Sequence, residues 1–318
     1  MNNPALKPNP ISATVQVTDQ QVRHFVDQGF LVVPGLVSPA EIDTLKRDLV
    51  TIARGGYPCE AIKPADPQTS DANVLRNILC VHQPHFISPV CRSFVAHAGI
   101  SAVLARVCAA HLPHWNGSVK CMQSMFFAKP PGKPGQAWHQ DEEYIPTRDR
   151  SLAGAWIAID DATVENGCLW VVPGSHRNGY LFPMRRPEDL DEYDGSFQSH
   201  GFDESAAIPV PVAAGSVVFF NGYLLHKSLK NRSTGYRRVL VNHYCNSWSL
   251  LPWQIEGEIA RHQIEKTGIH LSVATGDNRS VIPVAGADPY AWKGYDEPKK
   301  NVYLRSFDGQ AGIKAAHG

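Results

Sequence analysis

Residues 118–248 consist of short apolar runs separated by clusters of glycine and proline. The runs occupy residues 119–128, 155–159, 169–172, 217–220 and 239–244. Many short strands punctuated by turn residues are typical of an all-β barrel or of two sheets stacked in a jelly roll. The sequence therefore predicts a mainly β protein whose core spans about residues 118–248.

The part of the chain that precedes this core is predicted to be largely helical. A capping box at Thr18 begins a short helix, and a second one at Ser38 begins a longer amphipathic helix. A further helix or helix pair is expected over residues 89–108, with a break near Gly99. The histidines between residues 82 and 114 fall in this helical part and receive no functional role. These helices are expected to flank the β core.

No internal repeat and no low-complexity linker divides the chain. We therefore expect a single domain over residues 18–318, preceded by a flexible arm of residues 1–17. Two long polar stretches, 179–208 and 270–300, show no periodicity. Stretches of this length are usually functional lids or disordered segments.

Composition and charge exclude several classes of function. Thirty basic and thirty acidic residues balance to a formal charge of zero, which gives no reason to expect nucleic acid or an anionic membrane as a partner. The chain shows no signal peptide and no continuous apolar run of about 18 residues. Seven scattered cysteines without a C-x-x-C pair are typical of reduced thiols in a cytoplasmic protein. A cytoplasmic protein is therefore expected, and its oligomeric state stays open.

A His-x-Asp pair follows the first long run of the predicted core. In an extended segment His139 and Asp141 point to the same side, so both can reach one metal ion. A second histidine, His226, follows the strand predicted over 217–220. Two histidines and one carboxylate on one side of an iron ion leave sites open for a co-substrate and oxygen, and this facial triad is typical of non-haem iron(II) oxygenases. The three residues are therefore the predicted metal ligands and catalytic centre.

Arg237 lies in the predicted strand that follows His226. A guanidinium can hold a carboxylate through two parallel hydrogen bonds, which suits a dicarboxylate co-substrate. Ser228, two residues beyond His226, can donate to the same carboxylate. Arg237 and Arg238 point to opposite faces of a strand, so only one of them can face the interior of the barrel.

Three stretches, 138–144, 156–176 and 226–237, together resemble the phytanoyl-CoA dioxygenase family. The resemblance extends from about Thr18 to Tyr244, and it implies a double-stranded β-helix, a jelly-roll variant similar to the cupin fold. The positions that match the family's iron ligands are His139, Asp141 and His226. The positions that match its 2-oxoglutarate-binding residues are Arg237, Ser228, Met125, Trp156 and Gln123.

The resemblance implies a dioxygenase that uses Fe(II), 2-oxoglutarate and O2. Such an enzyme hydroxylates, or otherwise oxidises, an aliphatic C–H of a small-molecule metabolite and releases succinate and CO2. Related halogenases lack the carboxylate that Asp141 supplies, so its presence favours hydroxylation, while desaturation stays open. Family members often bring a lysine to 2-oxoglutarate from before the barrel, but here the segment 73–77 offers only Arg76. Without a strong basic cluster for the phosphates of CoA, we expect a small non-CoA substrate beneath a lid formed partly by 179–208.

Two other classes of function stay open at this point. A non-catalytic binding or sensor protein can keep the barrel and the metal, and a zinc- or manganese-dependent cupin-like isomerase or hydrolase can use similar ligands. The clamp of Ser228 and Arg237 favours the oxygenase. A binding protein without catalytic activity has no chemical need for that clamp. A zinc- or manganese-dependent isomerase or hydrolase uses no dicarboxylate co-substrate.

Other residues near the motifs have simpler interpretations. His176 is expected to lie in a turn, and His243 is expected to be a core histidine with hydrogen-bond partners. Trp138, Gln140 and Tyr144 flank the predicted ligands. We hypothesise from this adjacency that they face the substrate.

Overall fold

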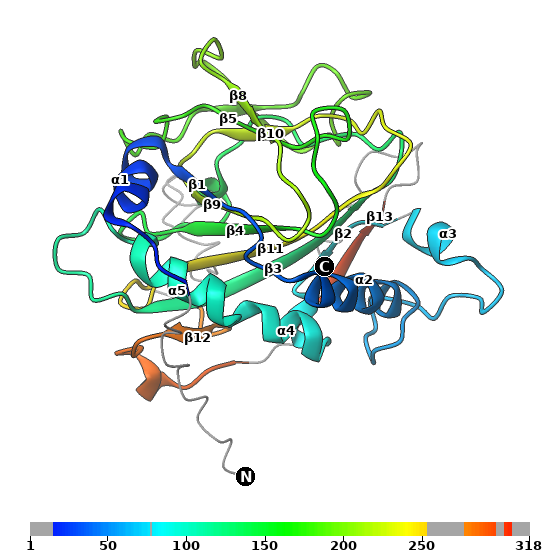
Figure 1. The fold of residues 1–318 in the computed structure, drawn as a ribbon, viewed down its shortest axis with the longest axis horizontal. Helices are drawn as coiled ribbons and strands as arrows, with labels where there is room; N and C mark the ends of the chain where they lie inside the picture. Colours follow the sequence, from blue (N-terminus) through cyan, green and yellow to red (C-terminus); the bar gives the residue numbers. More distant parts are fainter. Residues whose placement is uncertain (1–14, 77, 253–276, 297–301, 307–318) are drawn as a thin grey trace, which may run out of the picture.

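Two antiparallel sheets of unequal size lie one above the other, and helices cover the outer face of the larger sheet (Figure 1). The structure is a computed structural model and describes residues 15–76, 78–252, 277–296 and 302–306. The larger sheet contains, in spatial order, β1 (Phe30–Val33), β9 (Val217–Asn221), β4 (Ala153–Ala158), β11 (Arg237–Asn246), β3 (Val119–Lys129), β2 (Ile78–His82) and β13 (Tyr303–Ser306), and β12 (Ile282–Ala285) also pairs with β3. The smaller sheet contains β10 (His226–Ser228), β5 (Leu169–Val171) and β8 (Ile208–Val210), and a separate hairpin contains β6 (Met184–Arg185) and β7 (Gln198–Ser199).

Alternate side chains of the central strands fill the space between the two sheets. Trp156 and Val218 of the larger sheet pack in one cluster with Leu169 of the smaller sheet. Their chain neighbours Ile157 and Phe219 belong instead to the core beneath the helices. Successive residues of a strand point to opposite faces, so the central strands are buried on both sides and read as continuous apolar runs. The predicted mainly β, jelly-roll core with flanking helices is confirmed.

The helical layer forms as its capping signals predict. The helices are α1 (Asp19–Gln28), α2 (Pro39–Ala53), α3 (Asp71–Arg76), α4 (Pro89–Val95) and α5 (Ala98–Val107), with short 3-10 turns η1 (Pro84–Phe86), η2 (Asp141–Glu143) and η3 (Ala291–Lys293). The side chains of Thr18 and Ser38 both close complete capping boxes. Leu45 of α2, Phe94 of α4 and Leu104 of α5 pack in the core beneath the larger sheet, and Figure 1 shows these helices below it.

One sequence-based expectation about this region is wrong. Ile78–His82 is a buried strand that pairs with β3, so His82 does not belong to the helical layer. A short apolar run does not distinguish a strand from a buried helix by periodicity. The expected break near Gly99 is confirmed: it falls at residues 96–97, where Nδ1 of His97 caps α5 by accepting from the amide of Ile100.

The apolar stretch Pro89–Val107 is long and apolar enough, by length and composition, to cross a membrane. In the fold this stretch is divided between α4 and α5, and more than half of it is buried. Burial of this extent is what a pair of core helices shows.

The two long polar stretches have different structures. Residues 179–208 include the β6–β7 hairpin and end at the start of β8. Of the stretch 270–300, residues 277–296 are described, and they include β12, a strand that the sequence did not predict. Its proline and its short length weaken the strand pattern. The rest of that stretch and residues 1–14 of the predicted arm lie outside the described residues.

Candidate active site

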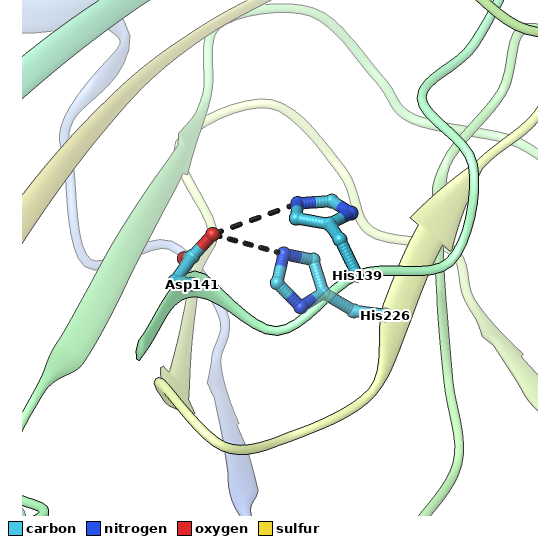
Figure 2. A group of neighbouring side chains, drawn as sticks. All are labelled: His139, Asp141 and His226. Atoms are coloured by element: carbon cyan, nitrogen blue, oxygen red, sulfur yellow. Dashed lines mark ion pairs between the residues drawn. The ribbon is translucent and has the colours of Figure 1, made fainter. Parts of the chain in front are cut away.

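The predicted metal ligands come together where β10 begins (Figure 2). His139 and His226 form an antiparallel bridge, in which the amide of each donates to the carbonyl of the other at 3.0 and 3.1 Å. The bridge brings the centroids of the two rings within 4.0 Å. Asp141 opens η2, and its Oδ1 lies 3.5 Å from Nε2 of His139 and 3.7 Å from Nε2 of His226. The backbone pairing of two distant segments therefore assembles the triad.

Both imidazoles are held with Nε2 directed toward Asp141. Nδ1 of His139 lies 2.8 Å from the carbonyl oxygen of Ala137, and Nδ1 of His226 lies 2.9 Å from that of Leu224. A carbonyl only accepts, so each Nδ1 carries a proton and each Nε2 keeps its lone pair for a metal. Burial, together with the charge of His226, lowers the pKa of His139 to about 3, so this ring is neutral. Two imidazole nitrogens and a carboxylate, with donor atoms within 4.8 Å of one another, fit iron(II).

Asp141 is oriented by His243, a residue that the sequence did not assign to the site. Nε2 of His243 lies 2.9 Å from Oδ2 of Asp141, while Oδ1 faces the two ligand histidines. Burial raises the pKa of the Asp141 carboxyl, but His226 and His243 outweigh this effect and hold the pKa well below its usual range. The carboxyl of Asp141 is therefore ionised. The expectation of a buried, hydrogen-bonded His243 is confirmed, and its partner gives it a positioning role.

Two buried cations line the same cavity as the triad. Arg237 of β11 and Lys129 of β3 are paired across the sheet. Nζ of Lys129 donates to Oγ of Ser228 at 3.0 Å and to the carbonyl of Leu229 at 2.7 Å. The guanidinium of Arg237 lies 5.5 Å from the ring centroid of Trp156, and its Nε has no hydrogen-bond partner. Among the described residues, no carboxylate forms an ion pair with either cation.

Electrostatics at this cation pair favour an anionic ligand. Burial, followed by the charge of Arg237, lowers the pKa of Lys129 well below its usual range. Burial lowers the pKa of Arg237 to about 10. Two adjacent like charges away from water destabilise each other, and a bound carboxylate would relieve both. Arg238 points the other way, where its guanidinium donates to both oxygens of Asp160 at 2.7 Å, so only Arg237 is available to a ligand in the cavity.

One cavity of about 860 Å³ connects the triad with the cation pair. It is lined by all eight residues predicted for the site, namely Gln123, Met125, His139, Asp141, Trp156, His226, Ser228 and Arg237. Of the three flanking residues only Tyr144 lines it. Trp138 donates from Nε1 to Glu204 at 2.6 Å, and the side chain of Gln140 donates to two backbone carbonyls, so these two hold the surrounding segments. His176 lies in a turn, as predicted, and bonds to the carbonyl of Val26.

Lys129 is a further residue of the site that sequence reasoning missed. The sequence offered Arg76 as the nearest match to an expected lysine, but Arg76 ends α3 and does not line the cavity. Lys129 is the last residue of β3 and lies at alternate spacing with Gln123, Met125 and Phe127, all of which line the cavity. Alternation from Met125 along this strand was the signal that could have identified it.

Two stacked antiparallel sheets with a His-x-Asp…His triad between them define a non-haem iron oxygenase with a double-stranded β-helix core. The sequence profile of the family described as phytanoyl-CoA dioxygenase (PhyH) matches residues 25–239. The chain belongs to this family, whose members are enzymes that depend on iron and 2-oxoglutarate.

Several known proteins are similar to this chain. Phytanoyl-CoA dioxygenase domain-containing protein 1 of Danio rerio is 30% identical over 278 residues, which cover 74% of this chain and 94% of that protein. Phytanoyl-CoA dioxygenase 1 of Oryza sativa subsp. japonica is 34% identical over 179 residues, which cover 54% of this chain and 60% of that protein. The crystal structure of the non-heme alpha ketoglutarate dependent carbocyclase SnoK from nogalamycin biosynthesis covers 80% of this chain and 93% of its own, with a TM-score of 0.55 and 22% identity. At this identity the structural likeness shows the fold.

Proposed function

We propose that this chain is a dioxygenase that uses Fe(II), 2-oxoglutarate and O2 to hydroxylate an aliphatic C–H of a small-molecule metabolite, with release of succinate and CO2. The metal ligands are the triad of His139, Asp141 and His226. Ser228 and Arg237, joined by Lys129, hold the distal carboxylate of 2-oxoglutarate. A cytoplasmic location is part of the proposal, and the free state of all seven cysteines supports it.

The observation that carries this proposal is the cation pair of Lys129 and Arg237 beside the triad. A buried cation without a counter-ion is costly, and two adjacent ones add repulsion. A carboxylate offsets both charges through charge-assisted hydrogen bonds, and Ser228, within 3.0 Å of Nζ of Lys129, can supply a further contact. A zinc- or manganese-dependent isomerase or hydrolase has no use for such a pair. The pair therefore favours an enzyme with a dicarboxylate co-substrate.

The residues around the triad have distinct tasks. Iron(II), when bound, supplies the activation of O2 that is coupled to oxidation of 2-oxoglutarate. His139 and His226 would hold the metal through their Nε2 atoms, together with the carboxylate of Asp141. Trp156 supports the guanidinium of Arg237 with its ring, and Met125 lines the same part of the cavity. These apolar walls limit the access of water to the reacting atoms.

Asp141 supports hydroxylation as the outcome. Its carboxylate takes the ligand position that halogenases leave to a halide, and the hydrogen bond from His243 holds it there. Iron held by this ligand set would supply the transfer of a hydroxyl group to the substrate carbon. Desaturation needs a second hydrogen abstraction, which depends on the substrate.

The proposal is tested by anaerobic titration of iron(II)-loaded protein with 2-oxoglutarate, with the visible charge-transfer band of the chelate as the signal. We expect a saturable band that Asp141→Ala removes and Arg237→Ala weakens. Arg238→Ala is the matched control, because its guanidinium pairs with Asp160 and should leave the titration unchanged. A folded, iron-bound protein without a band would refute the oxygenase proposal and favour a binding protein or another metal.

A further inference from the structure

The cavity is longer than 2-oxoglutarate alone requires. A strand rises about 3.3 Å per residue, so Gln123 and Lys129, which both line the cavity from β3, are about 20 Å apart. Lys129 marks the co-substrate end. Gln123 lies opposite His243, whose ring contacts Asp141. Gln123 therefore marks the metal end of the cavity and the space beyond the metal ligands. If the proposed function holds, this second half is where the substrate binds, and its chemistry describes the substrate.

His82 supplies the most informative polar group in this half. It is 6% exposed, lines the cavity from β2, and stacks on Tyr303 with the ring centroids 4.1 Å apart. Neither ring nitrogen of His82 has a hydrogen-bond partner. A buried polar atom without a partner is destabilising, and a ligand group at this position would satisfy it. His82 lies opposite Met125 of β3, and Gln123 lines the cavity two residues before Met125 on the same strand. The side-chain amide of Gln123 has no hydrogen bond among the described residues.

His82 is uncharged. Burial, together with the charges of Arg305 and His243, lowers the pKa of His82 to about 3. A neutral imidazole offers one donor and one acceptor, and a side-chain amide offers both an NH2 donor group and a carbonyl acceptor. Both groups match a hydroxyl, carbonyl or amide group, and neither supplies the charge that would hold an anion.

Exposed apolar side chains form the mouth of the cavity. Tyr144, Leu190, Phe197 and Tyr303 all line the cavity, although each is a large side chain that stands open to solvent. Leu190 is 65% exposed and Phe197 is 51% exposed. Exposed apolar groups gathered around a cavity mark a surface that an apolar ligand covers.

The cations near the mouth are mostly neutralised. Arg305 lies 3.4 Å from the carboxylate of Asp194, and Lys227 lies 3.3 Å from that of Glu204. Arg186 is the remaining lining cation outside the co-substrate end, among the residues that the structure describes. One arginine at the rim is a weak site for a molecule that carries several phosphates.

We propose that the substrate is an uncharged, mainly apolar molecule with a hydroxyl, carbonyl or amide group that hydrogen-bonds to His82 and Gln123. This group anchors the molecule beside the metal, and its apolar body lies against the aromatic and aliphatic mouth. His82 is then a residue that determines specificity, since it selects a neutral polar group on the substrate. The apolar side chains at the mouth of the cavity select the apolar part of the substrate.

Binding of a matched series of probes tests this inference. The probes are 4-phenylbutan-1-ol, butylbenzene, 4-phenylbutyrate and 4-phenylbutylamine, measured by anaerobic equilibrium dialysis against iron(II)-loaded protein with saturating 2-oxoglutarate. We expect the alcohol to bind about five- to tenfold more tightly than the hydrocarbon, the gain of one or two neutral hydrogen bonds, and more tightly than either charged probe. His82→Phe keeps the aromatic stack and should abolish the preference for the alcohol. The control variant is His114→Phe, which changes an exposed histidine outside the cavity and should keep the preference.

Each other result overturns the inference. Equal binding of alcohol and hydrocarbon, tightest binding of a charged probe, a preference that survives in His82→Phe, or no binding of any probe would each do so. The comparison of probes in the unchanged protein stands even where His82→Phe does not fold. The charge-transfer titration is run on the same samples, so failure of the proposed function appears as loss of the band and is separate from the dialysis result.

Discussion

Replacing Lys129 by methionine should weaken the binding of 2-oxoglutarate by about 30- to 150-fold. The ammonium of Lys129 already donates to Ser228 and Leu229, and its third N–H is available to a carboxylate. A hydrogen bond from a buried charged donor contributes about 2–3 kcal/mol, which corresponds to this loss of affinity. Arg237 remains in the variant, so binding should be weakened and not abolished.

The same substitution should change the stability of the protein little. It removes a buried cation that repels Arg237, which stabilises the ligand-free state. It also removes the donor to the carbonyl of Leu229 and leaves the hydroxyl of Ser228 with only the amide of Gln136 as donor. These effects oppose each other, and methionine has a similar length. We expect the free energy of unfolding to change by about 1 kcal/mol or less.

The assay is the anaerobic charge-transfer titration, repeated over a range of pH. Only the ammonium form of Lys129 attracts the co-substrate, so the affinity of the unchanged protein should fall as pH rises through the depressed pKa of Lys129. The methionine variant should lack this step. Lys230→Met is the matched control, because Lys230 pairs with the exposed Asp191 and lies outside the cavity. An unchanged dissociation constant in Lys129→Met would refute the assignment of Lys129 to the co-substrate site.

Three further substitutions separate the site from its supports. Arg238→Ala should lower the free energy of unfolding in urea by about 1 kcal/mol through loss of its two bonds to Asp160, with the affinity for 2-oxoglutarate unchanged; weaker binding would contradict the orientation of this side chain. Leu104→Ala removes a fully buried side chain of α5 and should lower the free energy of unfolding by about 2–5 kcal/mol, again with normal affinity. His243→Phe removes the partner of Asp141 and should weaken iron binding by about 10- to 100-fold in a competition titration with a chelator, whereas normal iron affinity would rule out a positioning role.

Local signals in the sequence predicted much of the secondary structure and of the site. The capping boxes at Thr18 and Ser38 depend on residues three apart, so a single helical turn decides them. The long apolar runs of β3 and β11 are visible because strands buried on both faces need apolar residues at successive positions. His82 was misplaced because the short run of β2 has no such clear pattern.

Residue types and short spacings thus determined most helices and strands and identified the candidate metal ligands and the arginine clamp. Each of these signals lies within a short stretch of sequence, such as His139-x-Asp141 or the segment from His226 to Arg237. Only the tertiary structure decided that Lys129 lies beside Arg237, that His243 holds Asp141, and that His82 enters the cavity. These contacts depend on which strands are neighbours and on their register. Register is set by the packing of both sheets at once, and a shift of one residue would turn every one of these side chains to the opposite face.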